Sequence, residues 1–482
     1  MTDPKKELQK LFTKKERYKN FGPTIAHLKI EGFRGIEKLE IDIESPITAI
    51  SGLNGTGKST VAQLCTCAYR KPVTESDQYK RHIIANYFPV SKADPKPFKD
   101  TASIEYEYVT AAEDKLQELT VYRKNSKWDG YKRQPERHCR YIGFTIYIPK
   151  VEQRDISIYR GNDITLLDEN ALSDVANKAI SKILNHPYEN LSSATATHKD
   201  SKTNIGFATK FGEKYSENHM GFGEGRVFYT VSSLETAPEQ SLFVLEEPET
   251  SLHEHAQYEL AKYLIDVCMR RKHQIILTTH SRAILNALPR ESRKLLYRDG
   301  KTVKVSNRTS TCEATGMLSL GYSSEKMVLV EDTRAKTLLT EIVRIAKPTL
   351  LKGLKISFVG SDDVVRTLTA KFKGDGYSVV GVRDGDKGGD PKLSLYKLPG
   401  TLPPEKEIFQ CTSVQMYVRE KYGCDLPQWL ALNKDSDFHD WPTMLAGDLS
   451  KTEEGLWEEL CFVYCKAWNL DELKALISDI EK

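Results

Sequence analysis

Apolar residues fall in short runs along the first 150 residues, and turn-forming glycine and proline separate these runs. Three runs lie between about Ile25 and Ile50, AHLKIEGFRGI, KLEIDI and PITAISG, and together they predict a β meander that leads into the strand before Gly52. Two further runs with alternating polarity are SIEYEYV and ELTVYRK. The apolar segment YIGFTIYIP, from Tyr141 to Pro149, predicts a buried strand. This part of the chain is therefore expected to be rich in strands.

Helical patterns and two polar insertions interrupt these strands. The segment VAQLCTCAYR, which follows the third run, predicts a helix. A polar, proline-containing stretch at about residues 75–100 predicts a first insertion. A second insertion, at about residues 163–219, begins with the helical pattern LSDVANKAISKIL. It then becomes rich in Ser, Thr, Asn and Lys, which predicts loops.

Strands and helices alternate regularly in the second half of the chain. SLFVLEEPE predicts a strand, residues 255–271 a helix and QIILTTHS a second strand, as a parallel βαβ unit requires. After a polar, turn-rich segment at residues 309–324, the predicted strands are KMVLVED, LKISFVG and YSVVGVRDGD, with helical patterns between them. The C-terminal residues have a helical pattern.

These patterns predict an α/β fold in several domains, because 482 residues exceed the size of one ordinary core. We expect an N-terminal lead segment at residues 1–22 and a large head at residues 23–310, which carries both insertions. A smaller α/β domain is expected at residues 311–415, followed by a helical C-terminal region at residues 416–482.

The composition, 39% apolar and 28% charged residues, is that of an ordinary globular protein. No stretch reaches the roughly 18 uncharged apolar residues of a membrane span. The N-terminus is charged from its third residue and has no apolar core of a secretory signal, so we expect a cytoplasmic protein. The nine cysteines are scattered, and we expect them to be reduced.

The formal net charge of +3 is too small for a chain that binds nucleic acid over its whole surface. One tract, from Arg123 to Arg140, is basic with interleaved aromatic residues. It has two interpretations, a solvated hairpin or a contact for a nucleic-acid backbone with stacking on the bases.

A phosphate-binding P-loop pattern, GLNGTGKST, extends from Gly52 to Thr60. It follows an apolar run and opens a predicted helix, as that loop requires. Backbone N–H groups of such a loop cradle the phosphates of ATP, its lysine reaches the β and γ oxygens, and its serine binds Mg²⁺. The predicted nucleotide-binding residues are Asn54, Gly55, Gly57, Lys58, Ser59 and Thr60, with Ser59 also a metal ligand.

Two carboxylates, Glu246 and Glu247, end the apolar run LFVL. Acids at the end of a buried strand are costly unless they serve a cation. We therefore expect Glu246 to orient hydrated Mg²⁺ and Glu247 to be the general base that activates water. His280, in TTHS at the end of the next predicted strand, is expected to contact the γ-phosphate.

The P-loop, EEPE and TTHS, in this order, resemble the ABC-type ATPase heads of the SMC, RecF and OLD (overcoming lysogenization defect) families. The resemblance extends over about Ile25 to Tyr297. It implies an ABC-type P-loop head that binds ATP and Mg²⁺, with Arg34 in LKIEGFRGI close to the nucleotide. It also implies that Gln153 joins the Mg²⁺ shell as the loop glutamine.

ATPase heads of these families work as dimers, because a signature loop of one subunit completes the ATP site of the other. The nearest match here is MGFGEGR, from Met220 to Arg226. It keeps Gly223 and Glu224 as nucleotide-binding candidates but has glycine or phenylalanine where the families have serine. The resemblance implies a homodimer or higher homo-oligomer formed through the heads. No heptad-rich segment of SMC length is present, so a chromosome-tethering role is not expected.

Acidic residues also end two predicted strands of the smaller domain. Glu331 follows VLV, and Asp384 and Asp386 follow VVGVR. If these strands are neighbours in a parallel sheet, the carboxylates meet at one edge and can hold Mg²⁺ or Mn²⁺ for phosphodiester chemistry. This arrangement resembles the Toprim domain of OLD-family nucleases, although Ala335 stands where that family commonly has a further acid.

Together the two sites predict an OLD-like, ATP-dependent DNA endonuclease whose Toprim-like site is gated by nucleotide. The resemblance implies a role in anti-phage defence. The alternative is an ATPase sensor or scaffold with a degenerate Toprim-like domain that sequesters or activates a separate effector protein. A repair clamp of the RecF type needs only the head, and the additional acidic domain argues against it.

Overall fold

The computed structural model describes residues 3–73, 82–110, 116–124, 127–149, 165–198, 201–318 and 326–482. The chain divides into two compact units, Met1–Thr309 and Ser310–Lys482. Each unit has its own sheets and its own buried apolar core.

A six-stranded sheet forms the centre of the first unit, in the order β15-β14-β3-β13-β12-β7. All neighbouring strands in it are parallel except β14 and β15. The strands are β3 (Ile47–Gly52), β7 (Cys139–Ile142), β12 (Leu242–Glu246), β13 (Gln274–Thr278), β14 (Arg293–Asp299) and β15 (Thr302–Asn307).

Every residue of β3, β12 and β13 is buried, because helices such as α3 (Lys58–Thr66) and α8 (Glu254–Arg271) pack on this sheet. Strands covered on both faces need continuous apolar runs, which is the pattern that these segments have. The predicted βαβ unit is confirmed as β12, α8 and β13.

A five-stranded antiparallel sheet, β2-β1-β4-β5-β6, packs its apolar face in one core with α3. Its strands are β1 (Thr24–Phe33), β2 (Ile36–Asp42), β4 (Phe98–Val109), β5 (Leu116–Lys124) and β6 (Lys127–Asp129). The strands predicted in this part are confirmed: β1 and β2 pair antiparallel, and β3, the strand before the P-loop, belongs to the central sheet. β2 alternates in polarity and keeps one face in water, whereas β3 is buried on both faces.

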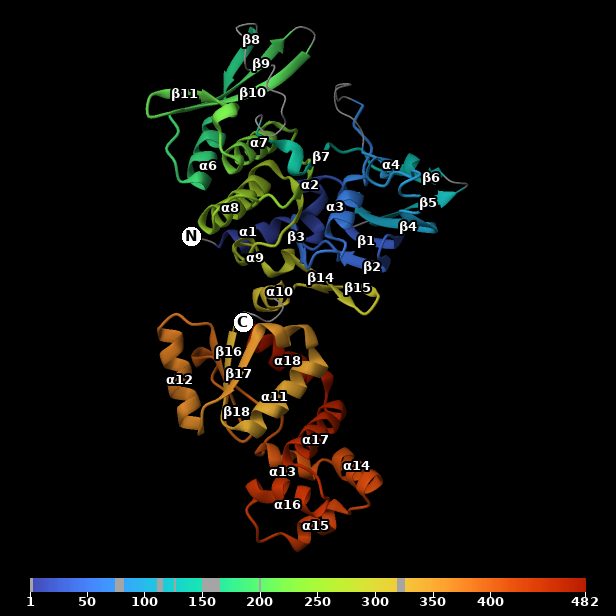
Figure 1. Ribbon diagram of the computed structural model, residues 1–482, viewed down its shortest axis with the longest axis vertical. Coiled ribbons are helices and arrows are strands. Elements are labelled where there is room, and N and C mark those ends of the chain that lie inside the picture. The colour runs from blue at the N-terminus through green and yellow to red at the C-terminus, as the bar shows by residue number, and fades with distance from the viewer. Residues whose placement is uncertain are drawn as a thin grey trace. The chain divides into compact units, whose positions relative to one another are not determined.

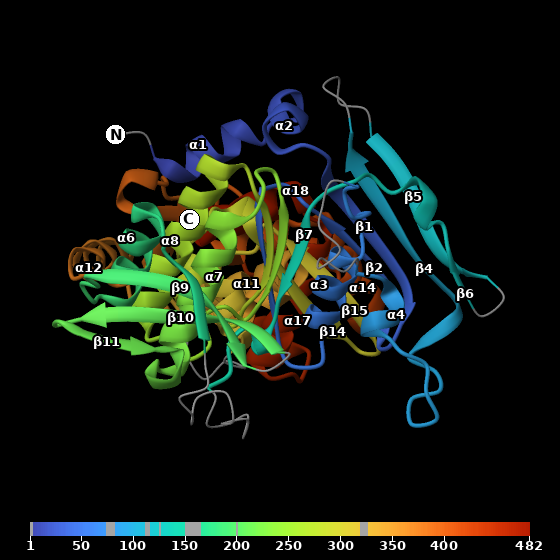
Figure 2. The same cartoon turned by 90° about the horizontal axis from the view of Figure 1, so that it is seen from above.

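The second insertion forms α6 (Asp174–Leu184) and a four-stranded antiparallel sheet, β11-β10-β9-β8. Figure 1 and Figure 2 both show the central sheet between this sheet and the five-stranded one. The strands are β8 (Thr165–Ala171), β9 (Asn190–His198), β10 (Ser201–Lys210) and β11 (Glu213–Ser216).

The helix predicted in this insertion is confirmed, and the loops predicted after it are wrong. Ala194 and Ala196 recur on one face of β9 and are buried, as is Ser192 on the same face. Threonines stand between them, and threonine favours strands because it is β-branched. The polar composition therefore concealed a half-buried strand.

The strand predicted at residues 141–149 is also wrong. β7 ends at Ile142, and a 3₁₀ helix, Phe144–Ile146, follows. β7 lies at the sheet edge and pairs only with β12, whose last pairing with it is Leu245 with Ile142. Within the described residues no strand pairing of β7 continues beyond that pair, and the side chain of Phe144 is exposed.

Further helices in the described part of the first unit are α1 (Pro4–Leu11), α2 (Lys14–Phe21), α4 (Ile84–Tyr87), α7 (Phe222–Thr236) and α9 (Arg282–Ala287). The helix predicted after the P-loop is confirmed as α3, although it ends at Thr66, earlier than the pattern suggested. Among the described residues, no helix is both long and apolar enough to cross a bilayer.

The second unit contains a fully parallel sheet in the order β17-β16-β18-β19. The strands are β16 (Lys326–Val330), β17 (Leu354–Phe358), β18 (Val379–Arg383) and β19 (Leu395–Lys397), and the helices between them are α11 (Thr333–Ala346) and α12 (Asp362–Gly374). The strands and helices predicted in this block are confirmed.

Other helices of the second unit are α10 (Thr311–Leu318), α13 (Pro404–Gln410), α14 (Thr412–Tyr422), α15 (Leu426–Leu432), α16 (Trp441–Asp448), α17 (Glu453–Ala467) and α18 (Leu470–Glu481). Side chains of α17 and α18, including Leu460 and Ile477, share one core with Val328 of β16 and Leu338 of α11. The C-terminal helices therefore continue the core of the sheet.

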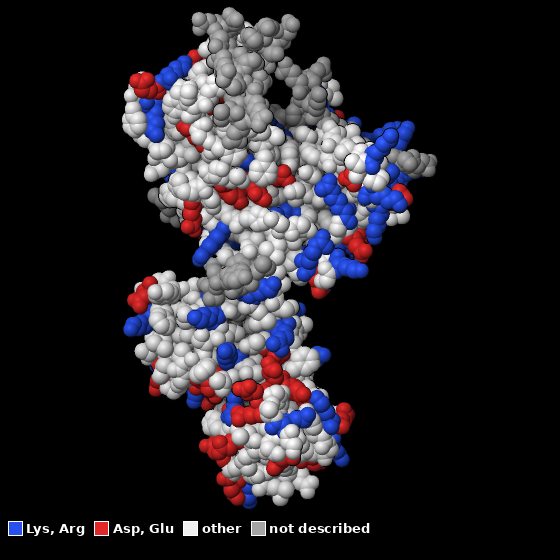
Figure 3. Space-filling model, in the orientation of Figure 1, with Lys and Arg blue, Asp and Glu red and all other residues white. Residues whose placement is uncertain are grey.

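Charged side chains of both signs cover the part of the first unit that carries the five-stranded sheet (Figure 3). Lysines there pair with acids, as in Lys38 with Glu40 at 2.9 Å. The basic tract forms the β5–β6 hairpin at its start, with the Arg123 guanidinium over the ring of Phe98. Arg137 of the same tract is buried and donates to backbone carbonyls, so it is not a surface contact.

Candidate nucleotide site and a second acidic site

The P-loop connects β3 to α3, and its glycines are needed where they stand. Gly52 has φ +145°, and a Cβ there would lie 2.2 Å from the carbonyl oxygen of Leu296 on β14. Gly57 has φ +94°, a conformation that other residues rarely adopt. The Lys58 ammonium donates to the carbonyl oxygens of Gly52 at 2.8 Å and Leu53 at 3.1 Å. The backbone carbonyls of the loop thus bind the ammonium group of its own lysine.

A cavity of about 370 Å³ opens over this loop. It brings together residues from four separate segments of the first unit. These are Arg34, Gly35 and Ile36, the loop residues Asn54, Gly55, Gly57, Lys58, Ser59 and Thr60, the acid Glu247, and Arg298. Every nucleotide-binding residue predicted from the P-loop therefore lines one cavity with Arg34 and the predicted general base. Arg298 was not predicted.

Glu246 ends β12 as a buried carboxylate. It accepts a hydrogen bond of 2.5 Å from the hydroxyl of Tyr141 on β7, and burial together with this bond raises the pKa of that tyrosine. The Mg²⁺ of a P-loop site takes oxygen ligands. The Glu246 carboxylate and the Ser59 hydroxyl both offer oxygen ligands, so these residues are chemically suited to bind Mg²⁺.

Glu247 follows Glu246 with φ +40°, which is unusual for a residue with a side chain. Its N–H donates to the carbonyl oxygen and the hydroxyl of Thr278 at 3.1 and 3.2 Å. This turn directs the carboxylate to the cavity, and its Oε1 lies 3.4 Å from Nε2 of His280. Burial, and then the Lys58 charge, lower the pKa of His280, so the imidazole is neutral at pH 7.

Two further residues support the backbone of Glu247 and His280, and the sequence had assigned a role to neither of them. Glu249 is buried, and its Oε1 accepts from the Thr279 hydroxyl at 2.5 Å and from the His280 N–H at 3.0 Å. Arg226 is buried on α7, and its Nη2 donates to the carbonyl oxygens of Glu246 and Glu247, each at 3.1 Å. Glu249 was visible as the last letter of EEPE, but nothing local marked Arg226.

The two signature-loop candidates do not line the P-loop cavity. Gly223 lies against the backbone, since a Cβ there would be 2.6 Å from the carbonyl oxygen of Ser251. The Glu224 carboxylate accepts hydrogen bonds of 2.7 Å from the hydroxyls of Tyr188 and Tyr215, both from the second insertion. Gln153, the expected loop glutamine, lies outside the described residues.

A second acidic site lies at the carboxyl edge of the parallel sheet in the second unit. β16 and β18 are neighbours, so the condition stated from the sequence is met and Glu331 and Asp384 follow adjacent strands. The Asp384 N–H donates to Oε1 of Glu331 at 3.2 Å. Burial and the nearby Glu331 charge raise the pKa of Asp384 to about 8, and burial raises the pKa of Glu331. Oδ1 of Asp384 is buried without a hydrogen-bond partner.

Three other acids near this edge have partners. Asp386 pairs with Lys387 at 3.1 Å, and Asp362 forms an ion pair with Arg383. Asp332 caps α11 by accepting from the N–H of Ala335 at 2.7 Å. Within the ranges that the structure describes, no three acidic, histidine or cysteine side chains are grouped closely enough to hold a metal ion.

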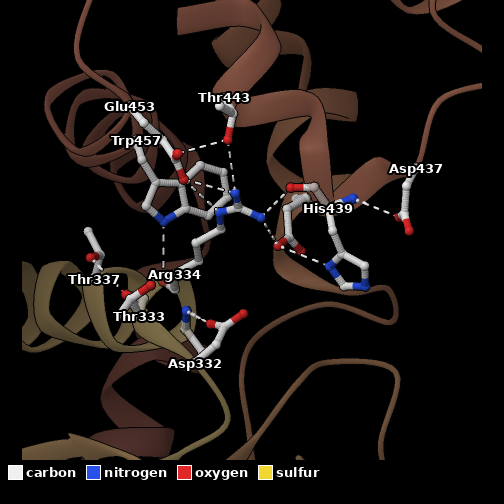
Figure 4. A network of polar contacts seen from close by, with 11 residues as sticks. Asp332, Thr333, Arg334, Thr337, Asp437, His439, Thr443, Glu453 and Trp457 are labelled. Atoms are coloured by element: carbon white, nitrogen blue, oxygen red, sulfur yellow. Dashed lines mark hydrogen bonds and ion pairs between the residues drawn. The ribbon is translucent and has the colours of Figure 1, made fainter. Parts of the chain in front are cut away.

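Arg334, the residue before Ala335, joins α11 to the C-terminal helices (Figure 4). Its guanidinium pairs with Glu405 at 3.1 Å and with Glu453 at 2.8 Å, and it donates to the carbonyl oxygen of His439. Glu405 is buried and also raises the pKa of Asp384. The acidic site is therefore bordered by a buried ion pair.

Sequence comparison gives two matches in the first unit. A family described as "AAA domain" matches residues 27–211, and one described as "AAA domain, putative AbiEii toxin, Type IV TA system" matches residues 144–286. Both matches support an ATPase in this part of the chain. The comparison with curated proteins gave no match.

Solved structures similar to this chain include three SMC heads. The SMC head domain from Thermotoga maritima has 15% identity and a TM-score of 0.33, over 59% of this chain and 98% of that one. The Smc head domain from Pyrococcus furiosus, bound to the C-terminal domain of ScpA, has 14% identity and a TM-score of 0.37, over 59% and 96%. An SmcHead bound to the C-winged helix domain of ScpA has 16% identity and a TM-score of 0.37, over 58% and 97%.

Proposed function

We propose that the ATPase domain binds ATP·Mg²⁺ in the P-loop cavity and hydrolyses it with Glu247 as general base. The observation that supports this proposal is that Lys58, Ser59 and Glu247 line one cavity, although Glu247 is far from the other two in sequence. Bound Mg²⁺ would neutralise charge on the phosphates, with Ser59 and Glu246 as its protein ligands.

In this proposal each side chain has one task. Lys58 leaves the carbonyls of Gly52 and Leu53 for the β and γ oxygens, because phosphate is the stronger acceptor. Glu247 accepts a proton from the attacking water, and neutral His280 donates a hydrogen bond to the γ-phosphate. Arg226 fixes the backbone of Glu247 by a hydrogen bond to its carbonyl oxygen, and Glu249 fixes the backbone of His280 by accepting from its N–H.

We further propose that the second unit is a Toprim-like, metal-dependent DNA endonuclease whose activity nucleotide gates, as in the OLD family. One observation carries this proposal: Glu331 and Asp384 meet at the edge of a parallel sheet, with raised pKa values and a buried Asp384 oxygen that has no partner. Carboxylates held together in this way repel one another, and a divalent cation removes that repulsion. Asp386 is the third proposed ligand.

The proposal also includes the oligomeric state of the protein, its contact with DNA and its biological role. Gly223 and Glu224 lie outside the P-loop cavity of their own chain, so a homodimer or higher homo-oligomer formed through the heads would give them a nucleotide to contact. DNA would be held mainly through its phosphates. An OLD-like protein of this kind would act in anti-phage defence in the cytoplasm.

Plasmid cleavage tests the nuclease proposal. The purified chain is incubated with supercoiled DNA and Mg²⁺ or Mn²⁺, with and without ATP, beside Glu331→Ala and Lys58→Ala. We expect nicking or linearisation that Glu331→Ala abolishes and that Lys58→Ala makes independent of ATP. Absence of cleavage under all conditions, while ATP turnover is intact, would exclude a self-contained nuclease.

A second candidate function is an ATPase sensor or scaffold that sequesters or activates a separate effector protein. The observation that favours it is the partnering of Asp332, Asp362 and Asp386 with other protein groups, which leaves two carboxylates to hold a metal. Under this function Glu331→Ala and Asp384→Ala would keep full biological activity, whereas Lys58→Ala would lose it.

A further inference from the structure

Arg298 lies at the rim of the P-loop cavity, on a strand that none of the nucleotide motifs includes. β14 runs parallel to β3, and Leu296 pairs with Gly52, the first residue of the P-loop. Arg298 is two residues further along, at the carboxyl edge where open α/β sheets bind their ligands. The register of these two strands thus places an arginine beside the loop that cradles phosphate.

The contacts of Arg298 are with the backbone of the nucleotide site. Its Nη2 and Nε donate to the carbonyl oxygen of Gly55 at 2.9 and 3.3 Å, and its Nη1 donates to that of Lys301 at 3.4 Å. A Cβ on Gly35 would lie 2.5 Å from Nη2, so the guanidinium packs closely against the residue after Arg34. The side chain therefore bridges the P-loop and the β1–β2 turn.

These contacts are weak for a guanidinium. A backbone carbonyl is neutral, and the described hydrogen bonds of Arg298 all go to carbonyls. Bonds between arginine and phosphate are shorter and about twice as strong, and the planar fork of arginine fits two phosphate oxygens at once. Lys58, the P-loop lysine, likewise donates its described hydrogen bonds to loop carbonyls. Both cations thus have a stronger partner in a nucleoside triphosphate.

We infer that Arg298 is a phosphate-binding residue of the ATPase site, which exchanges the Gly55 carbonyl for phosphate oxygens of the bound nucleotide. Arg298 adds a third positive charge to those of Lys58 and Arg34 around the triphosphate, which carries several negative charges. This inference rests on the proposed nucleotide site.

Equilibrium binding of a fluorescent ATP analogue tests the inference. We expect Arg298→Ala to weaken binding about tenfold, the size of one charge-assisted hydrogen bond. Arg298→Lys keeps the charge but not the fork, so it should lose less. The dissociation constant of Arg298→Ala should also rise less steeply with salt, because one ionic contact is gone. The matched control is Lys301→Ala, an exposed cation in the turn of the same hairpin, which should bind like the wild type.

Thermal unfolding without nucleotide separates phosphate binding from support of the fold. Arg298→Ala should melt at the wild-type temperature, because its side chain is exposed, and should show a smaller upward shift on addition of ATP. Wild-type affinity in Arg298→Ala, equal losses in Lys301→Ala, or a lower melting temperature that accounts for the weaker binding would each overturn the inference. Lys58→Ala identifies a different failure: if it binds ATP normally, the nucleotide site itself is wrong.

Discussion

Glu247 shows how single residues at the nucleotide site depend on contacts from distant segments. Its positive φ is a conformation that costs about 1–3 kcal/mol and persists only where surrounding groups hold it. Thr278 of β13 holds its N–H and Arg226 of α7 holds its carbonyl oxygen. The carboxylate itself is one third exposed, 33%, and is free to meet a water molecule. The backbone is thus held in place while the reactive group stays accessible.

Glu247→Gln keeps the size and the backbone of this residue and removes the base. We expect ATP turnover, measured as phosphate release, to fall at least about 100-fold, with nucleotide affinity close to that of the wild type. Glu254→Gln, an exposed acid at the start of α8, is the matched control and should turn over normally. Normal turnover in Glu247→Gln would show that another group activates water.

At the scale of elements, α11 is joined to the C-terminal helices by charge as well as by apolar packing. Arg334 lies on its first turn and pairs with Glu405 of α13 and Glu453 of α17. Glu405 is only 2% exposed, so its charge depends on this guanidinium. Trp457 adds a hydrogen bond from its indole N–H to the carbonyl oxygen of Arg334. The helix that follows Glu331 is therefore positioned by residues more than seventy positions away in sequence.

Arg334→Met should lower the free energy of unfolding of the second unit by about 2–4 kcal/mol, because it leaves a buried carboxylate without its partner. Urea unfolding followed by tryptophan fluorescence measures the change. The double variant Arg334→Met with Glu405→Gln should recover part of the loss, because the buried carboxylate charge is then removed, and the Glu453 carboxylate that remains is 40% exposed. Arg419→Ala, an exposed cation on α14, is the control and should change little. Strictly additive losses in the double variant would contradict a coupled pair.

At the scale of the whole molecule, two compact units with separate cores suggest two ligand responses. The proposed ATP site lies within Met1–Thr309 and the proposed metal site within Ser310–Lys482. A ligand that binds one folded unit raises the unfolding temperature of that unit by mass action.

Calorimetry of the full chain should therefore show two transitions. ATP with Mg²⁺ should raise one of them by several degrees, and Lys58→Ala should abolish this shift. Mn²⁺ without nucleotide should raise the other, and Glu331→Ala with Asp384→Ala should abolish that shift. A single transition that both ligands move together would mean that the two units unfold as one.

Much of the fold could be predicted because the patterns are local. The runs around β3, β12 and β13 are apolar on both faces, and the residues after them are those of a P-loop and an acidic strand end. The insertion sheet could not be predicted, since β9 and β10 bury small residues that a polar composition hides. No local pattern in YIGFTIYIP marks the end of β7 at Ile142, because that end belongs to a pairing with the distant strand β12.

The sequence by itself determined the P-loop, the acids that follow two sets of strands and the order of helices and strands, because each is specified by residues close together in the chain. Only the tertiary structure decided that Arg226 holds the backbone of Glu247, that Arg298 meets Gly55, and that β3 leaves its sequence neighbours for the central sheet. These contacts join segments that are far apart in sequence. They follow from strand order and register, which arise when all the buried faces pack at once.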